Sequence, residues 1–188
     1  MKLYSYETPL YGALNQANQW QDKDKVKSLG PFALLLHMTL REPAEKNMEV
    51  QAKRHGVKEF EDRITLYRGL GLPVKALETY REYQANGNWF SFTGFTSTSC
   101  EEDKALEFAY RYGTAPGNVP VLFVMEAEHG YGGDNAYLHD NNVSAFPKEQ
   151  EYLLGYAAWK VTAVKPDIEK DFGLGPFTVT EIHLKQHW

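Results

Sequence analysis

The sequence has one cysteine, Cys100, among its 188 residues, and it has no long apolar segment. A lone cysteine cannot form an internal disulfide, so nothing in the chain requires an oxidising compartment. The longest apolar run, Phe32 to Leu36, is far shorter than the roughly 20 residues that a transmembrane helix needs. The opening residues, Met1 to Glu7, also lack the apolar stretch of a signal peptide. We therefore expect a soluble protein that is cytoplasmic or is secreted without disulfides, and the lone cysteine favours the cytoplasm.

An excess of positive charge is missing as well. Lys and Arg together number 20 and Asp and Glu number 25, which gives a net charge of −5 at pH 7. A surface that binds a nucleic-acid backbone or anionic lipid would carry the opposite balance. The charge therefore argues against a nucleic-acid partner and against attachment to a membrane surface.

Repeats, low-complexity stretches and an evident linker are also lacking. Apolar residues make up 43% of the chain, which is enough for a packed core in a chain of this length. We therefore expect one domain over residues 1–188, with a mostly helical front segment over residues 1–60 and a strand-rich core over residues 61–188. We also expect a monomer.

The pattern of apolar residues predicts helices in the first third of the chain. Tyr11 to Trp20 has helical spacing, and Pro31 is expected to open a helix over Phe32 to Leu40. A third, polar helix is expected over Ala44 to His55.

Beyond residue 62 the pattern becomes mostly alternating, which is typical of strands. The expected strands are Ile64–Arg68, ending at Gly69, then Trp89–Ser99, Val119–Ala127, Glu149–Gly155, Ala157–Lys165 and Phe177–Lys185. Helices are expected over Val74–Gln84 and Glu101–Tyr112, the second with Ser99 as N-cap and Glu102 completing a capping box. Gly130–Asn142 reads as a polar loop. Helices first and strands later predict the α+β class.

Polar residues lie on the apolar faces of three expected strands, because residues two apart on a strand point the same way. Arg68 shares a face with Leu66, Ser97 follows Phe95, and Glu151 shares a face with Leu153. A shared cleft would explain this placement, since a lone buried charge is costly. An internal Arg68–Glu151 salt bridge would explain it equally, with Ser99 as a helix cap and Glu149 in solvent.

Three segments occur in a characteristic order and spacing: Leu66-Tyr67-Arg68-Gly69, Phe95-Thr96-Ser97-Thr98-Ser99, and Ser144-Ala145-Phe146-Pro147-Lys148-Glu149-Gln150-Glu151. Together they resemble the mono-ADP-ribosyltransferases that carry an Arg, Ser-Thr-Ser and Glu-x-Glu signature, both the clostridial toxins and the vertebrate ecto-enzymes. Glu7 to Asn15 is similar to the opening segment of that family. The likeness is close over about twenty residues and loose over most of the chain.

The resemblance implies transfer of ADP-ribose from NAD to an arginine side chain of a target protein, with release of nicotinamide. It implies NAD as co-substrate, no metal, a protein partner with an accessible arginine, and a possible toxin. The implied fold places N-terminal helices on a two-sheet, mainly antiparallel β core. Two other functions stay open: an NAD glycohydrolase that uses the same cleft, and a catalytically idle module that binds a protein through Gly130 to Phe146.

The resemblance also implies roles for particular residues. Glu151 would stabilise the positively charged ribose that forms as the glycosidic bond breaks, and it would hold the ribose hydroxyls. Ser97 would orient Glu151 by a hydrogen bond. Arg68 would bind the pyrophosphate of NAD, and Gly69 would let the backbone approach the nicotinamide amide.

Three further residues are candidates for contacts with the leaving nicotinamide or with the acceptor protein. Glu149 would select arginine as acceptor, since a guanidinium needs an adjacent carboxylate to bind it and assist its deprotonation. Phe108 would pack on the nicotinamide ring, although it could equally be a core residue of its helix. Phe146 would engage the target protein, with a packed Phe146-Pro147 turn as the alternative. The six histidines show no metal-binding spacing.

Overall fold

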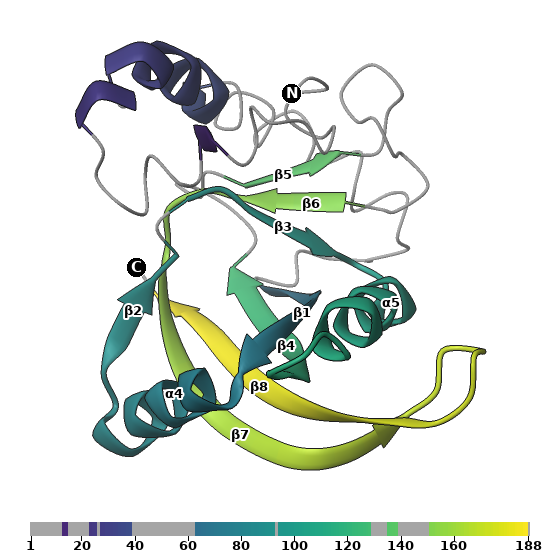
Figure 1. Cartoon of the computed structure of the whole chain (residues 1–188). Helices are drawn as coiled ribbons and strands as arrows, with labels where there is room; N and C mark the ends of the chain where they lie inside the picture. Colours follow the sequence, from purple (N-terminus) through teal and green to yellow (C-terminus); the bar gives the residue numbers. More distant parts are fainter. Residues whose placement is uncertain are drawn as a thin grey trace. The chain divides into compact units, whose positions relative to one another are not determined.

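Figure 1 shows the structure, which is a computed structural model. The chain divides into two compact units. The residues that it describes are 13–14, 23–25, 27–38, 63–92, 94–128, 135–138 and 151–187. The first unit comprises Met1–Asp62, Phe92–Ser97 and His129–Ala157. The second unit comprises Arg63–Ser91, Thr98–Glu128 and Ala158–Trp188. The prediction of a single catalytic domain stays a prediction.

Four long strands form most of the second unit. They are β1 (Arg63–Pro73), β4 (Asn118–Glu128), β7 (Ala158–Lys170) and β8 (Phe177–His187). β1 pairs antiparallel with β4, β4 pairs parallel with β8, and β8 pairs antiparallel with β7. The short β2 (Trp89–Ser91) pairs with β7. The apolar side chains that β4 buries, among them Val121, Leu122 and Phe123, lie in the middle of this strand set.

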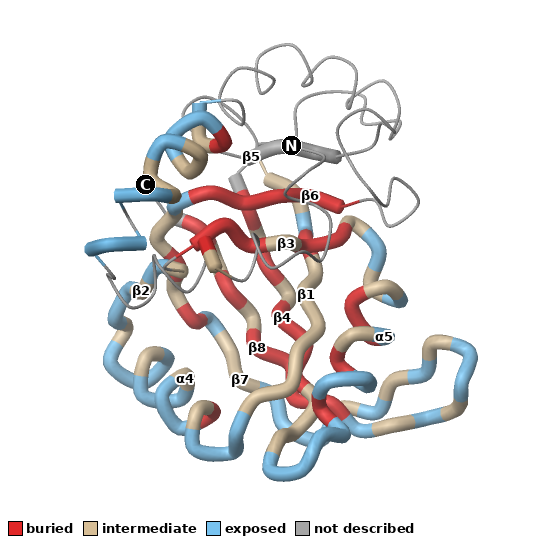
Figure 2. The backbone as a smooth tube through the Cα atoms, turned by 45° about the horizontal axis from the view of Figure 1, so that its top comes forward, coloured by how far each residue is buried: buried red, intermediate tan, exposed pale blue. Residues whose placement is uncertain are grey.

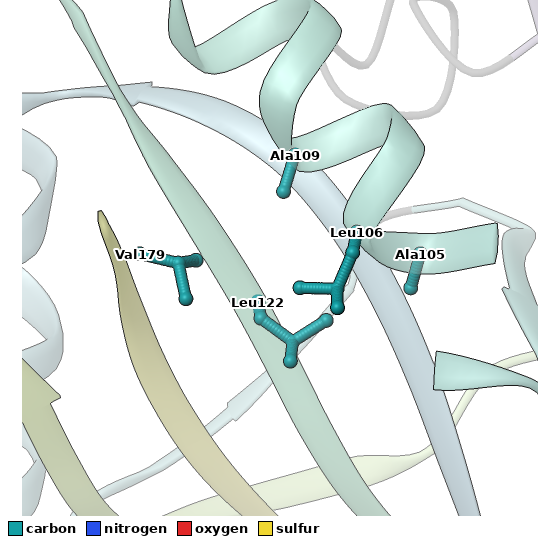
Figure 3. Close-up of a cluster of buried hydrophobic side chains, with 5 residues drawn as sticks. All are labelled: Ala105, Leu106, Ala109, Leu122 and Val179. Atoms are coloured by element: carbon teal, nitrogen blue, oxygen red, sulfur yellow. The ribbon is translucent and has the colours of Figure 1, made fainter. Parts of the chain in front are cut away.

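Helix α5 (Glu102–Gly113) packs on one face of this sheet. Its buried face carries Ala105, Leu106 and Ala109, which lie against Leu122 of β4 and Val179 of β8 (Figure 3). Two of the three helix residues are alanines, so the helix axis can approach the strands closely. Helix α4 (Val74–Asn86) contacts β7 and β1.

The first unit has its own apolar core. Residues 27–38 are helical, and Leu36 packs in a cluster with Leu14, Phe95 and Leu153. The strand β6 (Glu151–Leu154) pairs antiparallel with β5 (Asn135–Leu138). Every residue of β6 is buried, as the red tube in Figure 2 shows. Close packing on both faces of β6 limits the motion of its backbone, and Glu151 is the first residue of this strand.

The α+β class is confirmed, but the prediction of two sheets is wrong. The strands of the described part of the chain form one mixed sheet in the order β2-β7-β8-β4-β1-β3-β6-β5. The strand β3 (Thr96–Ser99) begins in the first unit and ends in the second, and it has a hydrogen-bonded neighbour on each side.

Three strand boundaries differ from the prediction. β1 continues past Gly69 to Pro73, because Gly69 pairs with Leu122 as the other residues of β1 pair with β4. The segment Trp89–Ser99 forms two strands, β2 and β3, with a bend at Gly94 between them. The expected loop Gly130–Asn142 contains β5, which pairs with β6 despite its polar surroundings.

Two helix starts also differ. Pro31 lies within the helical residues 27–38 and does not open that helix. Ser99 is not the N-cap of α5, because the N-cap is Glu101 and no side-chain cap bond is made there. The hydroxyl of Ser99 accepts a hydrogen bond from the backbone N–H of Glu101 at 3.0 Å, which forms a turn ahead of the helix.

The other segments that were expected beyond residue 62 occur within a few residues of the predicted bounds. Ala44–His55 lies outside the described residues. No helix in the described ranges is long and apolar enough to cross a bilayer.

Candidate active site

The structure brings Ser97 and Glu151 together from two strands of the first unit. Ser97 on β3 donates a hydrogen bond from its hydroxyl to Oε1 of Glu151 on β6, at 2.8 Å. The two residues are 54 positions apart in the sequence. Glu151 has only 9% of its surface exposed and is followed by the buried residues Tyr152, Leu153 and Leu154. The burial of β6 therefore holds the carboxylate, and the hydroxyl orients it.

A buried carboxylate of this kind has a definite chemical use. Poor solvation makes its negative charge act strongly on any positive charge that develops nearby. A hydroxyl donor limits the rotation of the carboxyl group, so the charge is directed before a substrate arrives. The pair suits the stabilisation of a sugar cation at a breaking glycosidic bond.

Arg68 lies in the second unit, on the face of β1 opposite to α5. It pairs with Phe123 of β4, and directly paired residues of antiparallel strands project from the same face. The ring of Phe123 packs on Tyr80 of α4, with 5.4 Å between the ring centroids. Arg68 is half-buried. Its guanidinium therefore lies on a face of the sheet where aromatic side chains gather.

Gly69, the next residue, faces α5. A Cβ atom added to Gly69 would lie 1.6 Å from the carbonyl oxygen of Ala105 and 2.5 Å from the amide nitrogen of Ala109. The helix backbone thus lies directly against β1, and only glycine leaves room for it. This packing is a reason for glycine that the sequence alone did not indicate. The role of Gly69 toward NAD stays a prediction.

Phe108 lies on α5, outside the fully buried face of that helix. It is half-buried, and its ring stacks on Tyr112 with 6.1 Å between centroids and an interplanar angle of 8°. The guanidinium of Arg111 lies 5.6 Å from the centroid of the Tyr112 ring. Packing of Phe108 on nicotinamide stays a prediction.

Glu149 and Phe146 lie outside the described residues. Their roles, in choosing arginine and in engaging the target protein, stay predictions.

A charged cluster in the second unit was not anticipated. Nζ of Lys170 on β7 lies 2.6 Å from a carboxylate oxygen of Glu102 on α5 and 2.8 Å from one of Glu181 on β8. Nε2 of His183 lies 2.8 Å from the other oxygen of Glu181. The alternation of Glu181 and His183 with Ile182 and Leu184 was the available signal, because it placed two ionisable residues on one face of an apolar strand.

The surroundings shift two pKa values in this cluster. Burial acts to lower the pKa of Lys170, but its hydrogen bonds with Glu102 and Glu181 outweigh burial and raise it. Burial acts to raise the pKa of Glu181, but hydrogen bonds with Lys170 and His183 outweigh burial and lower it. The charged forms are therefore favoured, and the cluster ties the first turn of α5 to β7 and β8.

Within the described ranges, no group of three or more His, Cys, Asp and Glu side chains is arranged to hold a metal ion. The expectation of a reaction without metal stays a prediction.

The sequence matches no family model and no curated protein. Among solved structures, the fold is similar to the enzymatic component C2-I of the Clostridium botulinum C2 toxin, with a TM-score of 0.59 and 16% identity over 98% of this chain. It is similar to the ATR domain of Salmonella SpvB, with a TM-score of 0.53 and 17% identity, over 97% of this chain and 87% of that domain. It is also similar to Vis toxin, an ADP-ribosyltransferase from Vibrio splendidus, with a TM-score of 0.50 and 17% identity, over 100% of this chain and 70% of the toxin.

The share of the relatives that is covered differs. This chain spans 41% of the C2-I chain, less than half of its length. The similarity to each relative extends over nearly the whole of this chain, and at these identities it concerns the fold.

Proposed function

From the premise that this chain has the fold of the mono-ADP-ribosyltransferase toxins, we propose that it transfers ADP-ribose from NAD to arginine side chains of a protein. The observation that carries the proposal is the hydrogen bond of 2.8 Å between the Ser97 hydroxyl and the buried carboxylate of Glu151. A fold alone supports many activities, so the proposal depends on this pair and on the motifs around it.

Glu151 acts on the bond between ribose C1′ and the nicotinamide nitrogen. When that bond breaks, its electron pair leaves with nicotinamide, and the ribose carries positive charge. The nearby carboxylate of Glu151 stabilises this charge, as carboxylates do in glycoside hydrolysis. Ser97 keeps the carboxylate in position through the transition state.

Arg68 is the residue that we assign to the pyrophosphate of NAD. A guanidinium is permanently charged and can donate two parallel hydrogen bonds to phosphate oxygens. Its half-buried position on β1 supports this role, because partial burial strengthens its interaction with an anion compared with full exposure.

Glu149 completes the reaction at the acceptor. A nitrogen of the target guanidinium forms the new bond to ribose C1′, and the proton that it loses passes to Glu149. In the family that the sequence resembles, Glu at this position goes with arginine acceptors and Gln with asparagine or related acceptors. The sequence has Glu149, which supports arginine.

The test is transfer of labelled ADP-ribose from NAD to agmatine and to arginine-rich protein. We expect Glu151→Gln to lower the transfer rate by roughly a thousandfold, since it removes the charge and keeps the shape. The matched control is Glu82→Gln, the same change at an exposed position of α4. An unchanged rate in Glu151→Gln, with the fold intact, would dismiss the assigned mechanism.

A second variant separates transfer from hydrolysis. We expect Glu149→Gln to suppress transfer to agmatine and to leave part of the release of nicotinamide, because only the acceptor loses its base. Release of nicotinamide by the unmodified protein with no labelled acceptor would identify a glycohydrolase. Absence of NAD binding in calorimetry would identify an idle module.

A further inference from the structure

Four aromatic side chains gather on the face of the second unit that carries Arg68. Tyr80 of α4 is the centre of the group, with ring centroids 6.4 Å from Tyr83, 5.6 Å from Phe90 and 5.4 Å from Phe123. Tyr83 and Phe90 stack on each other at 5.4 Å with an interplanar angle of 12°. Three ring contacts restrict the rotation of Tyr80, so its hydroxyl has a fixed place.

Arg68 lies next to this group. It is the direct partner of Phe123 in the antiparallel register, and such partners have Cβ atoms about 5 Å apart on one face. Tyr80 packs on that same Phe123. Arg68 and Tyr80 are therefore both neighbours of Phe123.

The electrostatics of Tyr80 agree with this placement. Burial raises the pKa of Tyr80 to about 12, and the positive charge of Arg68 acts in the opposite direction. The charge of Arg68 thus acts electrostatically on the hydroxyl of Tyr80. At neutral pH the hydroxyl is protonated, so it offers Arg68 a dipole and not a second charge.

We propose that Tyr80 is a positioning residue for Arg68, which it holds in the orientation that receives the pyrophosphate of NAD. The proposal rests on the proposed function, because it concerns the binding of the same co-substrate. No part of Tyr80 needs to touch NAD.

The physical reason is the cost of ordering a long side chain. An arginine loses rotamer freedom when it binds a phosphate, and this loss weakens binding unless the side chain is ordered beforehand. A phenol oxygen can accept a hydrogen bond from one guanidinium N–H and leave the remaining donors for phosphate oxygens. A neutral partner suits this task better than a carboxylate, which would compensate the charge that the phosphates need.

The experiment compares Tyr80→Phe with Tyr83→Phe. Both variants remove one hydroxyl from one helix and keep the ring in the same aromatic group. We expect Tyr80→Phe to raise the KM for NAD about tenfold and to keep kcat within about twofold. We expect Tyr83→Phe to leave both constants within about twofold of the unmodified protein. Calorimetry with NAD should show the same difference in Kd.

A double-mutant cycle then shows whether Tyr80 acts through Arg68. In an Arg68→Lys background, Tyr80→Phe should have little further effect on the Kd for NAD, because the guanidinium that it positions is gone. Additive effects of the two changes would overturn the proposal. So would a Tyr80→Phe protein with an unchanged KM, or a loss of kcat and stability that Tyr83→Phe shows equally.

The unmodified protein distinguishes this proposal from the one on which it rests. If the unmodified protein neither binds nor cleaves NAD, the proposed function is wrong, and the role of Tyr80 is overturned with it. If the unmodified protein binds NAD and Tyr80→Phe binds it equally well, only the role of Tyr80 is overturned.

Discussion

The two faces of β1 serve different purposes, although their residues alternate along one strand. On one face, Gly69 gives room to the backbone of α5, and a single added carbon would collide with it. On the other face, Arg68 lies beside Phe123 and the aromatic group around Tyr80. Two adjacent residues that sequence reasoning assigned to one ligand therefore have separate surroundings. Glycine here is required by packing, whereas Arg68 places a charged group beside aromatic rings.

The largest expected effect concerns the face of β1 that packs against α5. Gly69→Ala should destabilise the protein by more than about 4 kcal/mol, because the collision is with helix backbone and no side chain can rotate away. The control is Gly30→Ala, where an added Cβ meets nothing within 4 Å. Denaturant unfolding measures both. A Gly69→Ala protein as stable as the control would show that α5 does not pack as described.

The next prediction concerns the opposite face. Arg68→Lys should weaken NAD binding roughly tenfold or more, since lysine cannot make paired hydrogen bonds to phosphate, and it should change the unfolding free energy by less than about 1 kcal/mol. Arg81→Lys on α4, where Arg81 pairs with Glu78 on the surface, is the matched control. Calorimetry and denaturant unfolding distinguish the effects. If Arg68→Lys lost much stability and bound NAD normally, Arg68 would serve packing and not ligand binding, and the contrast between the two faces of β1 would be wrong.

A smaller effect is expected at the charged cluster, which holds α5 to its face. Lys170→Met should lower the unfolding free energy by about 2 kcal/mol, because Glu102 and Glu181 then lose a shared cation and repel each other. Lys165→Met changes an exposed lysine of the same strand and should have little effect. Equal unfolding curves for the two variants would contradict the assigned role of Lys170.

The smallest expected effect is the pH dependence of the difference in unfolding free energy between the unmodified protein and Lys170→Met. The pKa of Glu181 is lowered by folding, so its contribution is present above its usual value of 4.5 and is lost as the pH falls through the lowered value. The pKa of Lys170 is raised by folding, so its contribution is present below its usual value of 10.5 and is lost as the pH rises through the raised value.

The stability difference between the unmodified protein and Lys170→Met should therefore be largest between these limits and should shrink at both extremes. Unfolding curves across the pH range measure it. A difference that does not vary with pH would show that the interaction at Lys170 is not ionic.

Sequence reasoning succeeded where the signal was local. Helices α4 and α5 and strands β4, β7 and β8 follow from the residue pattern and composition within each segment. It failed at Trp89–Ser99, which was predicted to be one strand. The segment forms two strands with different partners, because β2 pairs with β7 and β3 pairs with β1. It also failed at β5, a short segment inside a Gly- and Asn-rich stretch of sequence, which forms a strand because β6 offers an edge for pairing. Pairing partners are not visible in the pattern of either segment.

The candidate site divides in the same way. The residue types at positions 68, 97 and 151, and their order in the chain, belong to the sequence alone, and the family resemblance that they carry implied a glycosidic reaction on NAD. The hydrogen bond between Ser97 and Glu151, the collision that requires Gly69, and the group around Tyr80 were decided by the tertiary structure. The reason is that periodicity is a property of neighbours along the chain, whereas each of these contacts depends on which strand or helix lies alongside another.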